Sequence, residues 1–112
     1  MGRTRSYKDH LKERLKNPKE AAGYLNAALE EDDISIFFLA LKDIADAWGG
    51  VGKLAEAASL NRQSLYRALA KDGNPRLVSI LAILYSLGME IQIKERGIVQ
   101  VGRKFIQKLT ST

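Results

Sequence analysis

The stretch LAEAASLNRQSLYRALAKDGNP, residues 54–75, decides how this chain folds. Its pattern predicts a short alanine-rich helix, a tight corner at residues 59–61 and a second helix. Two short helices joined by a three-residue corner have the dimensions of a helix-turn-helix. Ala55 and Ala58 are small enough to let the two helices approach closely. We therefore predict a helix-turn-helix over residues 51–70.

The second helix of this unit carries polar side chains that a hydrophobic core does not need. Asn61 can cap the helix, and the first turn that follows is the part of such a motif that enters the major groove. Arginine suits guanine and glutamine suits adenine through paired hydrogen bonds, and lysines beside the motif suit phosphates. The predicted DNA-binding residues are Arg62, Gln63, Ser64, Tyr66, Arg67, Lys53 and Lys71.

Two features of this stretch leave room for other interpretations. The same spacing also fits a helical hairpin whose polar face is merely solvated. In addition, Ser59 occupies the corner position that is often glycine, and a non-glycine residue at positive φ costs about 1–2 kcal/mol. We therefore expect a slightly altered turn.

Apolar spacing predicts helices in most of the remaining chain. A first helix ends before Asn17-Pro18, where the asparagine caps the next helix, and Asp32 or Asp33 caps a third that stops at Gly49-Gly50. Asn74-Pro75 repeats the cap-and-proline pattern before a last helix that ends at Gly88, and Gly73 has the place of a left-handed C-terminal cap. The residues expected to face inward in the third and last helices are Ile34, Phe37, Phe38, Leu41, Ile44, Ala45, Trp48, Leu77, Ile80, Leu81, Leu84 and Leu87.

The pattern changes after the last helix. Met89, Ile91 and Ile93 alternate with polar residues, which predicts a half-buried strand, and RGIVQV at 96–101 is a possible second strand. Such a strand must pair with the following one, with a second subunit or with a partner protein. The expected fold is all-α: a helix-turn-helix domain of about five helices with a short C-terminal β strand or hairpin.

Composition and charge exclude several classes of protein. The 112-residue chain has 46% hydrophobic and 28% charged residues, as expected for one folded domain, and no cysteine for disulfides or thiolate sites. No apolar run approaches the ~20 residues of a membrane helix, and the basic N-terminus lacks a signal-peptide core, so we expect a cytoplasmic protein. No nucleophile, metal cluster or catalytic carboxylate pair can be assembled, so we expect neither enzymatic activity nor a cofactor.

The net charge of +5 is unevenly distributed. Residues 1–16 carry six basic side chains against two acidic ones, and residues 94–112 carry five against one. Basic ends favour a polyanion such as nucleic acid, although they also simply keep a small protein in solution. The acidic run EEDD at 30–33 lacks the spacing of a calcium loop, which leaves helix capping or contact with a basic partner.

Four segments, AAGYLNAALEEDD, FFLALKDIADAWG, SLYRALAKDGNP and LGMEIQI, make the chain similar to a known family. Over about residues 18–93 it closely resembles the addiction-module antidote proteins, which are HigA-like bacterial antitoxins with a helix-turn-helix similar to that of lambda-type phage repressors. The resemblance implies a homodimer that binds its own double-stranded operator DNA, with Asn61 to Ala70 as the recognition helix. It also implies a cognate toxin resembling the RelE/ParE group, which the antidote neutralises by direct binding.

These observations predict three regions: a basic N-terminal helical arm (1–17), a helix-turn-helix DNA-binding domain (18–93) and a basic C-terminal tail (94–112). The tail extends beyond the family's usual length, so the resemblance assigns it no role. Two alternatives share these features. A stand-alone phage-type repressor would have no toxin, and a protein-interaction module would keep the fold without binding DNA.

Overall fold

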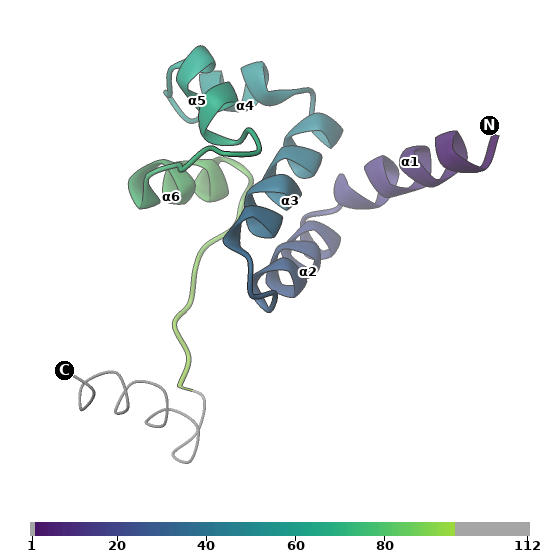
Figure 1. Ribbon diagram of the computed structural model, residues 1–112, viewed down its shortest axis with the longest axis horizontal. Coiled ribbons are helices and arrows are strands. Elements are labelled where there is room, and N and C mark those ends of the chain that lie inside the picture. The colour runs from purple at the N-terminus through teal and green to yellow at the C-terminus, as the bar shows by residue number, and fades with distance from the viewer. Residues whose placement is uncertain (1, 96–112) are drawn as a thin grey trace.

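The computed structural model describes residues 2–95, and their helical content confirms the all-α prediction. Within this range the chain forms six helices and no strand (Figure 1). Their bounds are α1 Gly2–Leu15, α2 Pro18–Leu29, α3 Ile34–Ala47, α4 Val51–Ala57, α5 Arg62–Ala68 and α6 Leu77–Ser86.

Helix α3 is the centre of the structure. It packs against α1, α2 and α4, while α4 in turn packs against α5 and α6. Seven of its fourteen residues are buried, and they lie on the face that the periodicity predicts: Phe37, Phe38, Ala40, Leu41, Ile44, Ala45 and Ala47. Ile34 is an exception: it is the first residue of α3 and is 56% exposed.

The last turn of α1 is joined to the end of α3. Leu15 is buried in the core, and the indole Nε1–H of Trp48 donates a hydrogen bond to the Leu15 carbonyl at 2.6 Å. Leu11 packs against the same core, whereas Tyr7 is exposed. The C-terminal part of α1 is therefore fixed to the body of the protein, and its N-terminal part extends away from it (Figure 1).

Two predicted N-caps are confirmed. The Asn17 side chain accepts hydrogen bonds from the backbone N–H groups of Lys19 and Glu20, and Pro18 occupies the first position of α2. Asp33, rather than Asp32, caps α3 by accepting from the Ser35 N–H at 2.9 Å. These bonds satisfy donors that a helix start leaves without intrahelical partners.

Glycine ends two helices as predicted. At the end of α3, Gly49 and Gly50 both have positive φ, and the Gly50 N–H donates to the Ala45 carbonyl at 2.7 Å. At the end of α6, Gly88 has a φ of +78° and the Met89 N–H donates to the Leu84 carbonyl at 2.8 Å. This pattern is the Schellman motif, in which a left-handed residue lets the chain turn back onto the last carbonyls.

The predicted start of α6 is wrong. The helix begins at Leu77, three residues after Asn74, and its N-cap Arg76 makes no side-chain capping bond. Pro75 is instead buried in the connection between α5 and α6. Leu77 and Leu81, which we expect to face inward, are 64% and 45% exposed, and Ile83 takes the buried place.

Gly73 also differs from its prediction, since it has no positive φ. A Cβ at this position would collide with the backbone carbonyls of Arg67 and Ala68. Glycine is needed here because the chain passes close to the end of α5, and not because of a left-handed turn.

The predicted strand at Met89–Ile93 is absent. Residues 89–95 are irregular; Met89 packs against the core, but Ile91 and Ile93 are 45% and 98% exposed. A strand requires backbone hydrogen bonds to a neighbouring strand, and residues 90–95 form no backbone hydrogen bond with any other described segment. The possible partner strand at 96–101 lies outside the described residues. In residues 2–95, no helix combines the length and apolar character required to cross a bilayer.

Candidate nucleic-acid interface

Helices α4 and α5 are joined by a tight turn that closes as a Schellman motif. The Leu60 N–H donates to the Ala55 carbonyl at 2.8 Å, and the Ser59 N–H donates to the Glu56 carbonyl at 3.2 Å. Ser59 occupies the left-handed position with a φ of +57°. The expectation of an altered turn is therefore wrong: serine adopts the backbone conformation that glycine usually supplies, at the steric cost of a Cβ.

Helix α5 is held against the core by two buried leucines and has a side-chain cap at its N-terminus. Leu65 and Leu69 are 3% and 4% exposed and pack into the core cluster. The Asn61 side chain accepts from the Ser64 N–H at 2.8 Å, which confirms the predicted cap. Because both apolar contacts lie on one side of a two-turn helix, the opposite side faces solvent.

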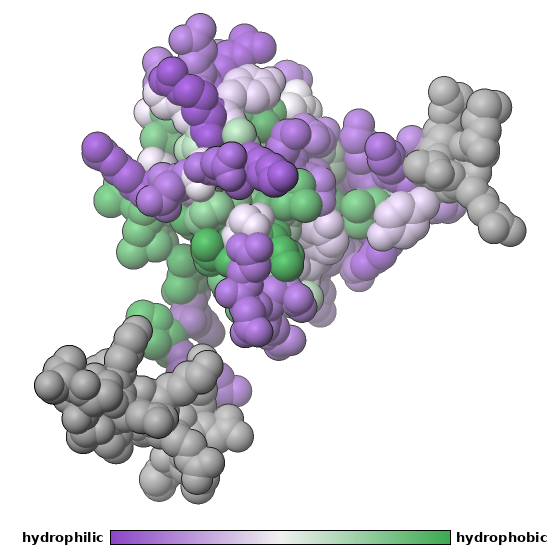
Figure 2. Space-filling view, in the orientation of Figure 1, coloured by the Kyte–Doolittle hydropathy of each residue, from purple (hydrophilic) through white to green (hydrophobic). Residues whose placement is uncertain are grey.

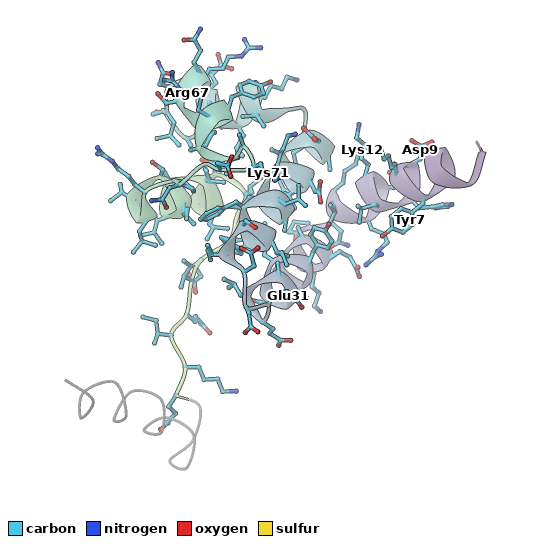
Figure 3. The ribbon with its side chains drawn as sticks, in the orientation of Figure 1. Tyr7, Asp9, Lys12, Glu31, Arg67 and Lys71 are labelled. Carbon is cyan, nitrogen blue, oxygen red and sulfur yellow. The ribbon has the colours of Figure 1, made fainter. Side chains whose placement is uncertain are left out.

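All seven predicted DNA-binding residues are exposed, although they do not form a single cluster. Arg62, Gln63, Ser64, Tyr66 and Arg67 lie on α5, Lys53 lies on α4, and Lys71 lies in the connection from α5 to α6. Figure 3 labels Arg67 and Lys71. On a helical wheel, Gln63 and Arg67 lie opposite the buried Leu65, whereas Arg62 and Tyr66 lie on the flank of α5.

A shallow open hollow of about 450 Å³ lies between this flank and the start of α4. Lys53, Arg62 and Tyr66 line it, together with Glu56, Leu60 and three glycines, Gly49, Gly50 and Gly52. The Arg62 guanidinium lies so close to Gly52 that a Cβ there would be 2.8 Å from Arg62 Nε. The glycines were not among the predicted site residues. Their signal in the sequence is GGVG at 49–52, which spans the N-cap and first turn of α4 and leaves space beside the two cations.

The basic side chains of this surface form no ion pair, although Glu56 lines the same hollow as Lys53 and Arg62. Among the side chains from residue 7 to 95, the structure has two ion pairs, Arg14–Glu20 and Lys16–Glu13, both near the α1–α2 junction. Between residues 49 and 76 the chain carries five basic side chains against two acidic ones; Arg76 is the basic residue that we did not predict. The α4–α5 surface is thus a basic region available to an anionic partner.

The α2–α3 half of the molecule has the opposite charge. Residues 18–48 carry seven carboxylates against two lysines. A groove of about 290 Å³ runs between the two helices, with an alanine-rich floor, the exposed side chains Ile36 and Leu39, and Glu31 and Asp43 at its rim. Figure 3 shows Glu31 on the side of the molecule opposite Arg67.

One hydrogen bond fixes the rim of this groove, which we define as the acidic groove. The Tyr24 hydroxyl donates to Asp43 Oδ2 at 2.7 Å and so connects α2 to α3. Burial, this hydrogen bond and the negative charge of Asp43 all raise the pKa of Tyr24 well above its usual range. The phenol therefore remains a neutral donor throughout the physiological range.

Within the described part of the chain, no group of three or more His, Cys, Asp or Glu side chains is placed to hold a metal ion. His10 is exposed on α1, and Glu30 to Asp33 are exposed around the α2–α3 turn. Asp33 is used as a helix cap, and the pKa of its carboxyl is lowered by hydrogen bonds from the backbone and hydroxyl of Ser35.

Comparisons with known proteins place the chain in a family. The model of a family described as "probable addiction module antidote protein" matches residues 6–95, most of the chain. A Haemophilus influenzae protein, described as uncharacterized, is 34% identical over 83 residues, which cover 74% of this chain and 84% of the relative. No solved structure matches the chain significantly. The chain therefore belongs to the family of probable addiction module antidote proteins.

Proposed function

We propose that this protein is the antitoxin of a type II toxin–antitoxin pair and that it represses its own operon by binding operator DNA. The observation that carries the DNA-binding part is the exposed polar face of α5. Leu65 and Leu69 fix the helix in the core, and the side chains on its other side have no role in packing. A lambda-repressor-like, HigA-like helix-turn-helix over residues 51–70 accounts for this arrangement.

The positions of the side chains suggest a division of roles at the DNA. Gln63 and Arg67 face away from the core and are placed to meet base edges, with Ser64 beside them. Arg62, Tyr66 and Lys53 line the hollow next to α4, where a DNA phosphate matches the two cations. Lys71 and Arg76 lie beyond α5 and suit flanking phosphates. Arg62 is thus assigned to the backbone rather than to guanine.

The antitoxin part of the proposal is supported by family membership and by the acidic groove. A toxin resembling the RelE/ParE interferases acts on RNA and is expected to be basic, so it complements the carboxylates of the α2–α3 half. The acidic groove and the basic α4–α5 surface lie on different helix pairs, which leaves the DNA-binding side chains free when a toxin is bound.

A reporter assay tests the repressor function. The region upstream of the gene is fused to a reporter, and the protein is supplied from a second plasmid. We expect repression that Gln63→Ala and Arg67→Ala relieve and that Leu39→Lys, on the other half of the molecule, leaves intact. Repression unaffected by either α5 substitution contradicts the proposal and favours a protein-interaction module.

Co-expression with the product of the neighbouring gene tests the antitoxin function. That product should arrest growth, and the wild-type protein should restore growth. Gln63→Ala should restore growth as well as the wild type, whereas the charge reversal Glu31→Lys combined with Asp43→Lys should not. A neighbouring gene product that is harmless, with repression intact, favours the stand-alone phage-type repressor.

A further inference from the structure

Helix α6 presents an apolar face that nothing in the described chain covers. Four large side chains on this face are exposed: Leu77 at 64%, Val78 at 75%, Leu81 at 45% and Tyr85 at 84%. Their spacing of one, four and eight residues places them on one side of the helix, and hydrophobic colour gathers over α6 in Figure 2. Contiguous exposed apolar surface of this kind marks an interaction site.

The chemistry of this face selects its partner. The sequence of α6, LVSILAILYS, contains no charged residue. DNA requires basic side chains, and a basic toxin is better matched by the acidic groove. A surface that is apolar throughout is complementary to itself, as a two-fold symmetric contact requires. We therefore infer that the exposed face of α6 binds the same face of a second copy of this chain.

The size of the face agrees with a small dimer interface. Since one aromatic side chain alone offers about 150–250 Å², the four side chains together present on the order of 500 Å² per copy. Two copies then bury about 1,000 Å², which is the lower limit for a specific protein–protein interface.

A two-fold axis through the middle of the exposed face gives a specific packing. With the helices antiparallel, Leu81 contacts its own copy, and Leu77 of one copy lies opposite Tyr85 of the partner subunit. The tyrosine hydroxyl remains at the edge, where water reaches it. The side chains of α5 take no part in this contact, so two DNA-binding helices stay accessible. The contact is argued from α6 alone. Its role rests on the proposed function, because a dimer supplies the two copies that bind an inverted repeat.

Substitution at the axis tests the contact directly. Light scattering on the full-length chain should give about twice the monomer mass of 12.4 kDa for the wild type. Leu81→Lys places two positive charges against each other and should reduce the mass to that of the monomer. Leu29→Lys, at a leucine of similar exposure on α2 that lies outside the acidic groove, should leave the dimer intact. Far-UV circular dichroism confirms that both variants are folded.

Three outcomes overturn the inference: a monomeric wild type, a Leu81→Lys variant that stays dimeric, or a Leu29→Lys variant that dissociates equally. A monomeric wild type would indicate that another segment of the same chain covers α6. A Leu81→Lys variant that stays dimeric would indicate that this face of α6 binds a different partner.

A DNA-binding assay distinguishes a failure of this inference from a failure of the proposed function. Leu81→Lys should bind a single half-site as the wild type does, but should lose at least tenfold in affinity for a fragment that carries both half-sites. If Leu81→Lys has the lower mass but neither it nor the wild type prefers the operator, the dimer contact is supported and the proposed repressor function is refuted.

Discussion

At the scale of single residues, Ser59 adopts a strained backbone conformation that fixes the turn at the site. Its left-handed backbone closes the turn between α4 and α5, and the hydrogen bonds of Ser59 and Leu60 depend on it. Glycine adopts this conformation without the steric cost that a Cβ incurs. The direction of α5 is thus set by a strained residue, which the buried Leu65 and Leu69 hold in place.

Replacing Ser59 should therefore change stability in a predictable order. Ser59→Gly is expected to raise the free energy of unfolding by about 1 kcal/mol, because relief of the left-handed strain outweighs the added chain entropy. Ser59→Val should lower it, because β-branched residues tolerate positive φ poorly. Urea denaturation measures both variants, and a glycine variant less stable than the wild type would contradict the assignment of strain.

At the scale of secondary-structure elements, short helices depend on their caps. Helix α5 has only seven residues, and the Asn61 side chain satisfies one of its free N–H groups. Helix α3 is longer and well buried, yet it too begins with a side-chain cap from Asp33. The loss of a cap should affect both stability and the function of the helix that it starts.

Two substitutions of Asn61 should separate stability from binding. Asn61→Ala removes the cap and should cost about 1 kcal/mol in the free energy of unfolding. Asn61→Asp keeps a capping oxygen and the stability, but places a negative charge beside the DNA and should weaken binding strongly. Urea denaturation and operator titration on the same samples check this. Equal DNA affinity for Asn61→Asp and wild type would refute the position of α5 at the DNA.

The cap of α3 should be pH-dependent. Hydrogen bonds from Ser35 lower the pKa of Asp33 below its ordinary value of 3.8, so the folded state favours the carboxylate. This contribution is fully present above pH 3.8 and is lost as the pH falls through the lowered pKa. Asp33→Asn keeps the capping oxygen without titrating. The stability difference between wild type and Asp33→Asn should therefore be constant at neutral pH and change only in acid; a change between pH 5 and 7 would contradict this origin.

At the scale of the whole molecule, the sequence predicts the α-helical class and the exposed side of α5, because capping residues and glycines act locally. Asn17, Asp33, Gly49 and Gly88 each have the role that their residue type predicts. The same reasoning fails where burial depends on distant contacts. Periodicity assigns Leu77 and Leu81 to the core, because an apolar face looks the same whether it packs inside one chain or against another. The prediction of a strand at 89–93 is wrong because an alternating sequence does not supply a neighbouring strand to pair with.

The distribution of charge also emerges only at this scale. The carboxylates of α2 and α3 and the cations of α4 and α5 form two oppositely charged surfaces on one small domain. One surface suits DNA and the other a basic protein, whereas α6 contains no charged residue. Under the proposed function, these three surfaces would bind an operator, a toxin and a second copy of the chain.

The most direct test of the central claim, that α5 reads operator sequence, is fluorescence anisotropy with labelled DNA. The fragment from upstream of the gene is compared with a scrambled fragment over a series of salt concentrations. We expect a preference for the native fragment that persists at moderate salt, that Gln63→Ala and Arg67→Ala abolish, and that Lys53→Ala and Arg62→Ala leave in place while lowering affinity for both fragments. Equal and steeply salt-dependent binding of both fragments, unchanged by Gln63→Ala and Arg67→Ala, would show that α5 contacts no bases.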